Sequence, residues 1–188
     1  TSTRRLIIHE KVYTKFKEKL VNAYSQLKIG NPLNEKVKMG SLAGETQRNE
    51  VKQQVQKLLA SSQMVYGSLD SVQVIDADAD KGAFLSPILL MNDKPLSSEE
   101  PHNIEAFGPV STIMPYKNMD EAIELSKKNN YAKGEAEANL IFAKELFNLN
   151  KGYVKALPYL LRAKQLYQNI NDSLGIAQCY LQIGVSTW

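Results

Sequence analysis

Residues 104–116 decide the fold of the first part of this chain, and they read Ile104-Glu105-Ala106-Phe107-Gly108-Pro109-Val110-Ser111-Thr112-Ile113-Met114-Pro115-Tyr116. The Gly108-Pro109 pair marks a turn. The run from Val110 to Tyr116 is mostly apolar and contains β-branched residues, which predicts a strand. The stretch therefore predicts a turn followed by a strand, with the carboxylate of Glu105 and the ring of Phe107 just before the turn.

Short apolar runs and amphipathic stretches alternate around this strand from residue 1 to residue 128. Apolar side chains recur every three or four residues in three stretches, which predicts helices over residues 12–28, 51–59 and 119–128. Asn118 is placed to cap the last of these helices. Further extended segments are predicted over residues 6–8, 64–66, 72–75 and 83–91. Alternating strands and helices of this length predict an α/β fold.

Four motifs in this part of the chain stand in the order and approximate spacing of one enzyme family. Ile104 to Val110 resembles the Glu-x-Phe-Gly-Pro-Val signature of aldehyde dehydrogenases. Thr1 to Ile8 resembles the segment that follows the catalytic cysteine, and Ala83 to Leu89 resembles the strand before the signature. Residues 29–42 resemble the Gly-x-Pro…Met-Gly-x-Leu loop. Residues 39–44, 76–84 and 101–107 are also similar to the dehydrogenase half of bifunctional phenylacetate-degradation enzymes.

The resemblance implies an activity, a cofactor and two binding residues. Members of the family oxidise an aldehyde to an acid with NAD or NADP, and in the phenylacetate enzymes the aldehyde is a CoA-linked semialdehyde. The Glu105 carboxylate would accept hydrogen bonds from the nicotinamide ribose, because a carboxylate can accept two donors at once. Phe107 would pack near the nicotinamide ring. NAD or NADP is therefore the implied cofactor, and a small-molecule aldehyde is the implied substrate.

The catalytic residues of the family are expected to lie outside this sequence. By resemblance, the nucleophilic cysteine would stand just before Thr1, and the general base and the dinucleotide-binding unit would lie further upstream. No Gly-x-Gly-x-x-Gly motif occurs in the chain. The single cysteine, Cys179, is expected to be a small buried apolar residue. Residues 1–128 are thus expected to form a partial catalytic domain that is inactive alone, with no catalytic residue.

The sequence changes in character from residue 129 to residue 188. No strand is predicted there, and apolar stripes predict three helices: Ala138, Phe142 and Leu146 mark one, residues 157–170 a second, and Ala177, Tyr180, Leu181, Gly184 and Trp188 a third. Residues 130–136 align with residues 171–177 at an offset of 41, and a recurring helix-turn-helix unit of this length is typical of a helical solenoid. The pattern resembles tetratricopeptide repeats. We expect an all-α repeat domain over residues 129–188, joined to the first domain between about residues 116 and 131.

Composition narrows the classes of function. The net charge is +3 and the Lys and Arg residues are spread among acidic ones, so no nucleic-acid groove is predicted. No apolar run approaches the roughly 20 residues that span a bilayer, and no secretory leader is visible. One cysteine suits a reducing compartment, and a cytoplasmic location is expected. No metal site is predicted, because the Asp76-Asp78-Asp80 run has Lys81 where a calcium loop needs glycine.

Two alternatives to the dehydrogenase interpretation remain open. The chain is an interaction protein in one of them, with repeats that bind a peptide or protein partner and a catalytically inactive first half. In the other, the two halves were joined artificially. The segment Glu121 to Lys128 fits both halves, as the end of the dehydrogenase stretch and as a repeat helix, so the position of the join stays open.

Overall fold

A computed structural model describes residues 4–149 and 152–185. The chain divides into two compact units, Thr1–Pro115 and Tyr116–Trp188. The predicted domain boundary lay after residue 128. The helix over residues 119–128 therefore belongs to the second compact unit, although we had placed it in the first domain.

A mixed sheet forms the centre of the first unit. Its strands are β1 (Arg5–His9), β2 (Gln63–Tyr66), β3 (Ile88–Met91) and β4 (Val110–Tyr116), in the order β1-β4-β3-β2. β3 is parallel to β4, with Ile88 opposite Val110, and antiparallel to β2. β3 and β4 lie in the middle, so their apolar runs are the buried ones. The predicted strand at 110–116 is confirmed, and the predicted extended segment at 6–8 lies within β1, which is half-buried at the edge of the sheet.

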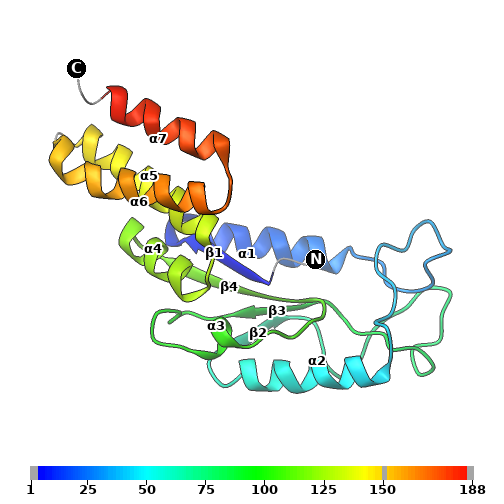
Figure 1. Ribbon diagram of the computed structural model, residues 1–188. Helices are drawn as coiled ribbons and strands as arrows, with labels where there is room; N and C mark the ends of the chain where they lie inside the picture. The colour runs from blue at the N-terminus through cyan, green and yellow to red at the C-terminus, as the bar shows by residue number, and fades with distance from the viewer. Residues whose placement is uncertain (1–3, 150–151, 186–188) are drawn as a thin grey trace. The chain divides into compact units, whose positions relative to one another are not determined.

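Helices α1 (Glu10–Ser25) and α2 (Glu45–Leu58) lie on opposite sides of this sheet (Figure 1). Tyr24 of α1 donates a hydrogen bond to Ser111 Oγ of β4 at 3.3 Å. On the other face, α2 packs on the strands through a cluster of buried apolar side chains: Val51, Val55, Leu58, Leu85, Ile88, Leu90, Ala106 and Val110. Side chains alternate between the two faces along a strand, so β4 contacts α1 on one face and α2 on the other.

Two loop regions differ from the predicted pattern. Residues 72–75 do not form a strand, and only an isolated bridge joins Ile75 to Gly30. Gly30 has φ +153, and a Cβ atom there would lie 2.0 Å from the carbonyl oxygen of Ile75, so only glycine fits this crossing. A short helix, α3 (Glu100–Asn103), occupies a stretch for which the sequence pattern predicts no helix or strand.

Four consecutive helices make up the described part of the second unit: α4 (Met119–Lys128), α5 (Ala132–Asn148), α6 (Tyr153–Asn169) and α7 (Ser173–Val185). Each packs against the next, and α5 also contacts α7. Asn118 caps α4 as predicted, accepting a hydrogen bond from the backbone N–H of Glu121 at 3.0 Å. α6 begins at Tyr153, four residues before the predicted stretch 157–170, and Pro158 lies inside it, in its second turn.

The buried face of α7 is not the predicted one. We expected Ala177, Tyr180, Leu181 and Gly184 to form a packed stripe, with Trp188 outside the described residues. The helix instead packs through Ile176, Cys179 and Ile183, while Tyr180 is 54% and Leu181 70% exposed. Both faces of this helix are apolar, so periodicity alone could not choose between them.

Candidate functional site

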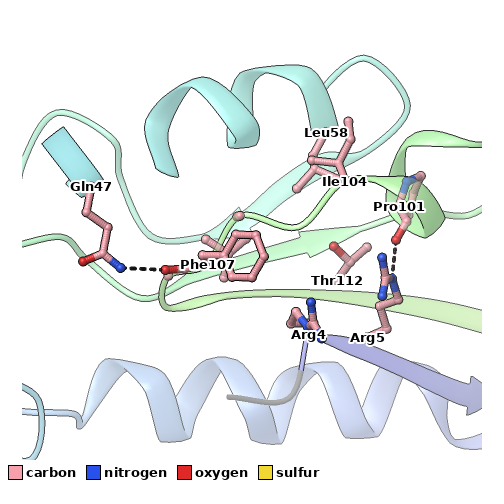
Figure 2. A pocket seen from close by; sticks show the side chains of 11 residues that line it. Arg4, Arg5, Gln47, Leu58, Pro101, Ile104, Phe107 and Thr112 are labelled. Atoms are coloured by element: carbon pink, nitrogen blue, oxygen red, sulfur yellow. Dashed lines mark hydrogen bonds between the residues drawn. The ribbon is translucent and has the colours of Figure 1, made fainter. Parts of the chain in front are cut away.

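A cavity of about 440 Å³ opens beside the Phe107 turn in the first unit. Figure 2 shows Arg4 and Arg5 approaching it from the start of β1, and Gln47 from α2. The other lining residues come from α2, α3, the segment after α3 and β4. The lining residues are Arg4, Arg5, Gln47, Leu58, Pro101, Ile104, Ala106, Phe107, Gly108, Val110 and Thr112.

The backbone at Phe107 is in the left-handed region, with φ 50. A bulky residue rarely adopts this conformation, and the cost is of the order of 1–3 kcal/mol. Gln47 holds it in place, because its side-chain amide donates to the Phe107 carbonyl at 3.0 Å and accepts from the N–H of Ala43 at 3.0 Å. The ring of Phe107 is consequently turned outward and is 71% exposed. An exposed aromatic ring on a held turn is available to pack against a ligand.

Gly108 allows the turn to approach α2. A Cβ atom at this position would lie 2.7 Å from Cγ2 of Val51, and Val51 is fully buried. The glycine of the signature therefore serves close packing between the turn and the helix.

Glu105 and Phe107 are brought together by one side chain. The guanidinium of Arg4 forms an ion pair with the Glu105 carboxylate and lies 6.0 Å from the centre of the Phe107 ring. Both side chains of the ion pair are partly exposed, at 45% for Arg4 and 35% for Glu105. Phe107 and Arg4 line the cavity. Glu105 does not line it, but its carboxylate is paired with Arg4.

Arg5 has a structural role next to this pair. Its guanidinium donates to the backbone carbonyls of Pro101 at 2.5 Å and His102 at 2.6 Å, and so ties β1 to α3. Burial lowers the pKa of Arg5, as does the neighbouring charge of Arg4. The segment before the signature is thereby anchored to the first strand.

Cys179 is buried as predicted, with no exposed surface. Burial raises the pKa of its thiol, and the charges of Lys144 and Lys164 oppose that shift only in part. A buried thiol held in the protonated form is a poor nucleophile. The described residues also contain no group of three or more His, Cys, Asp or Glu side chains placed to hold a metal ion.

Two helix junctions of the second unit, α4–α5 and α6–α7, share one geometry at the predicted offset of 41 residues. Asn130 and Asn171 are both in the left-handed region, with φ 50 and 56. The next residues, Tyr131 and Asp172, each donate their backbone N–H to the carbonyl five residues earlier, at 2.9 Å in both cases. This is the Schellman geometry that ends a helix. The sequence alignment of residues 130–136 with 171–177 is therefore also an alignment of backbone conformations.

Sequence reasoning singled out Glu105 and Phe107 but missed Arg4 and Gln47. Arg4 stood only in the quoted strand motif, and Gln47 lay in the first turn of an amphipathic helix with no distinguishing pattern. Gln47 and Phe107 are sixty residues apart, so their contact carries no local signal.

Residues 1–150 match the sequence profile of the aldehyde dehydrogenase family. This chain belongs to that family. The match extends past residue 128, where we expected the resemblance to end, and past the last residue of α5. No helix within the described residues is long and apolar enough to cross a membrane.

The chain is 30% identical over 130 residues to the 3,4-dehydroadipyl-CoA semialdehyde dehydrogenase of Aromatoleum evansii. That match covers 69% of this chain and 25% of the relative. The chain therefore spans about a quarter of the length of the curated relative that it matches.

Solved structures agree with the fold. Aldehyde dehydrogenase 21 from Physcomitrella patens, in complex with its reaction product succinate, is 29% identical with a TM-score of 0.53, over 68% of this chain and 24% of that one. Betaine aldehyde dehydrogenase from Staphylococcus aureus, in complex with NAD+, has a TM-score of 0.58 and 22% identity, over 66% of this chain and 24% of that one. The second likeness concerns the fold alone.

Proposed function

We propose that this chain supplies the nicotinamide-ribose end of the cofactor site in a complete NAD(P)-dependent aldehyde dehydrogenase. The observation that carries the proposal is the Arg4–Glu105–Phe107 group beside the cavity, in a chain of this family. A carboxylate and an exposed aromatic ring two residues apart suit a ribose diol joined to a flat heterocycle.

The residues of the chain bind and orient the cofactor in this proposal. The Glu105 carboxylate accepts hydrogen bonds from the ribose hydroxyls, and it has acceptor positions enough to share with the Arg4 guanidinium. Phe107 offers its exposed ring to the nicotinamide, held outward by the Gln47 hydrogen bond. The bound cofactor accepts hydride from the substrate.

The residues of this chain would form only part of a cofactor site. The cavity of about 440 Å³ is in the range of small-molecule pockets, but its lining comes from one unit and includes no phosphate-binding glycine loop. Cys179 cannot supply the thiolate that the family uses, because it is buried and its pKa is raised. We therefore propose that the chain alone is inactive.

A CoA-linked semialdehyde is the substrate class that we propose for the complete enzyme. The support is the similarity to the Aromatoleum evansii semialdehyde dehydrogenase together with the phenylacetate-type motifs in residues 39–44 and 76–84.

A chimera tests the role of Glu105 and Phe107. Residues 1–128 would replace the matching quarter of the Aromatoleum evansii relative, and cofactor reduction would be followed with a CoA-linked semialdehyde and with a simple aldehyde. We expect Glu105→Gln and Phe107→Ala to raise KM for the cofactor about tenfold or more. Glu50→Gln, a change on the exposed surface of α2, is the matched control. Equal kinetics for all three variants in an active chimera would refute the assignment.

The proposed inactivity has its own test. Titration of this chain with NAD+ and NADP+ should show no saturable binding in the micromolar range, and no turnover with aldehydes. Micromolar affinity for either cofactor would contradict the proposal.

A second candidate function is protein interaction through α4–α7 as tetratricopeptide-like repeats. The matched junctions at Asn130 and Asn171 support it, because a repeated backbone geometry is what a solenoid requires. We expect deletion of residues 132–188 to abolish capture of a protein partner and to leave cofactor behaviour unchanged. Capture that survives the deletion would exclude the repeats as the binding element.

A further inference from the structure

The cavity beside Phe107 carries positive charge. Arg4 and Arg5 line it, and none of the described residues in its lining is an Asp or a Glu. The guanidinium of Arg5 is already bound to two backbone carbonyls of α3. The Arg4 side chain is 45% exposed, and its carboxylate partner, Glu105, does not line the cavity. A ligand in this cavity therefore meets Arg4 as an exposed cation.

The backbone of Arg4 is held against the sheet, so its side chain starts from a fixed point beside the Phe107 ring. The carbonyl of Arg4 accepts a hydrogen bond from the N–H of Thr112 in β4 at 2.8 Å. The guanidinium lies 6.0 Å from the centre of the Phe107 ring (Figure 2). The turn that carries this ring is itself held by the hydrogen bond from Gln47. A planar ligand that packs on Phe107 is therefore placed close to a positive charge.

The distance from this charge to a ligand ring sets the size of its effect. Packed aromatic rings have centres about 4.5–7 Å apart, so a ring on Phe107 lies within roughly 13 Å of the Arg4 guanidinium. Over roughly 6–13 Å, a unit charge changes the affinity for a cation by about twofold in water-like surroundings and by up to about a hundredfold at an effective dielectric constant near 20. The paired carboxylate of Glu105 offsets part of this effect. We therefore expect a discrimination of about three- to tenfold against a cationic ring.

Arg4 and Glu105 act on such a ring in opposite directions. A nicotinamide ring is positively charged in the oxidised form and neutral in the reduced form, with nearly the same shape in both. The guanidinium of Arg4 repels the oxidised ring and has no net charge to repel in the reduced one. The Glu105 carboxylate attracts the oxidised ring by the same rule. Because Arg4 lines the cavity and Glu105 does not, the repulsion is the stronger of the two effects.

We propose that Arg4 makes this site distinguish between the two redox states of a nicotinamide ring, with a preference for the reduced state. This inference rests on the proposed cofactor site and adds to it a residue that determines which state of the cofactor is held more tightly. By disfavouring the cationic ring, Arg4 also favours the transfer of hydride to it, because the repulsion disappears when the ring becomes neutral.

Titration of the full chain with nicotinamide riboside and with its dihydro form tests the proposal. Both probes carry the ribose and the ring without any phosphate, so they differ in the charge of the ring alone. The amide resonances of Phe107 and Thr112 in heteronuclear NMR report binding at this cavity. We expect dissociation constants in the millimolar range, about three- to tenfold lower for the dihydro form.

Three variants and a control separate the charge of Arg4 from other effects. Arg4→Gln should bring the two dissociation constants to within about twofold of each other, whereas Arg4→Lys keeps the charge and should keep the preference. Glu105→Gln should weaken the binding of both forms and increase the preference, because it leaves Arg4 unpaired. Lys15→Gln removes one positive charge from the exposed surface of α1, outside the cavity lining, and should leave the ratio unchanged. Circular dichroism checks that each variant keeps its secondary structure.

The outcomes distinguish this inference from the proposed cofactor site. Equal binding of the two forms by the parent chain would overturn the inference and leave the cofactor site standing. The same conclusion would follow if the ratio in Arg4→Gln equals that of the parent chain, or if Lys15→Gln lowers it as much as Arg4→Gln does. Binding of neither form up to about 20 mM would overturn the inference and the proposed cofactor site together.

Discussion

The guanidinium of Arg4 forms an ion pair with the carboxylate of Glu105 and lies 6.0 Å from the centre of the Phe107 ring. Arg4 therefore contacts both residues that the family resemblance connects with the cofactor. The adjacent Arg5 makes a different kind of contact, with two backbone carbonyls. The two arginines should respond differently to the same substitution.

We expect Arg4→Gln to change the free energy of unfolding by less than about 1 kcal/mol, because partly exposed ion pairs contribute little. Urea denaturation followed by circular dichroism measures this change. A loss well above that value would mean that the Arg4–Glu105 pair supports the fold and not only the arrangement of the site.

Arg5→Gln should destabilise the chain by about 1–3 kcal/mol, because the hydrogen bonds from the Arg5 guanidinium to the carbonyls of two buried residues, Pro101 and His102, are lost. The Arg4→Gln variant is the neighbouring control. If both variants are equally stable, the ties between Arg5 and α3 are dispensable.

Gly108→Ala should lower the free energy of unfolding by about 1–3 kcal/mol, because the new methyl group would overlap the buried side chain of Val51. The same denaturation experiment applies. In the double variant Gly108→Ala/Val51→Ala, the space vacated by Val51 should accept the methyl group. The combined cost should then be smaller than the sum of the single costs, and simple additivity would count against the steric explanation.

Glu135 is 5% exposed, and Nε and one terminal nitrogen of Arg162 donate to its Oε1 at 2.9 and 2.8 Å. Arg162→Met should destabilise the chain by about 1–3 kcal/mol, because it leaves a buried carboxylate without its charged partner. The double variant Arg162→Met/Glu135→Gln should recover part of the loss. No recovery would indicate that the stem of Arg162, and not its charge, supplies the stabilisation.

Tyr167 should make the chain sensitive to alkaline pH. Burial raises the pKa of Tyr167 to about 12, with smaller contributions from Glu137, Cys179 and Asp172. The unfolded chain releases this proton near pH 10, so stability is complete below about pH 10 and falls as the pH rises toward 12. Between pH 9 and pH 12, the free energy of unfolding of the Tyr167→Phe variant should fall by roughly 2–3 kcal/mol less than that of the parent chain. Equal losses would contradict the assignment.

Cys179 should resist alkylation in the native state. Its thiol is buried and its pKa is raised, so reaction with iodoacetamide at pH 8 should be about a hundredfold slower than in urea. Rapid native labelling would show that α7 opens readily and would weaken the argument that the thiol is no nucleophile.

Several elements could be predicted from the sequence because their signals are local. The Gly108-Pro109 turn, the β4 run and the Asn118 cap of α4 each depend on neighbours within a few residues. The 41-residue offset between the Asn130 and Asn171 junctions could also be predicted, because the residues around the two junctions align with each other. Family membership followed from four ordered motifs, and the profile match over residues 1–150 confirms it.

The tertiary structure alone decided which surfaces these elements use. Residues 72–75 have a strand-like composition but find no ladder partner beyond one bridge. Gln47 meets Phe107 across sixty residues, and Arg5 meets Pro101 across ninety-six, through contacts that no local pattern encodes. In α7 the apolar residues fall on both sides, and packing against the neighbouring helices buries Cys179 and leaves Leu181 in solvent. Periodicity identifies an apolar face, whereas only the positions of the other elements determine whether that face is covered.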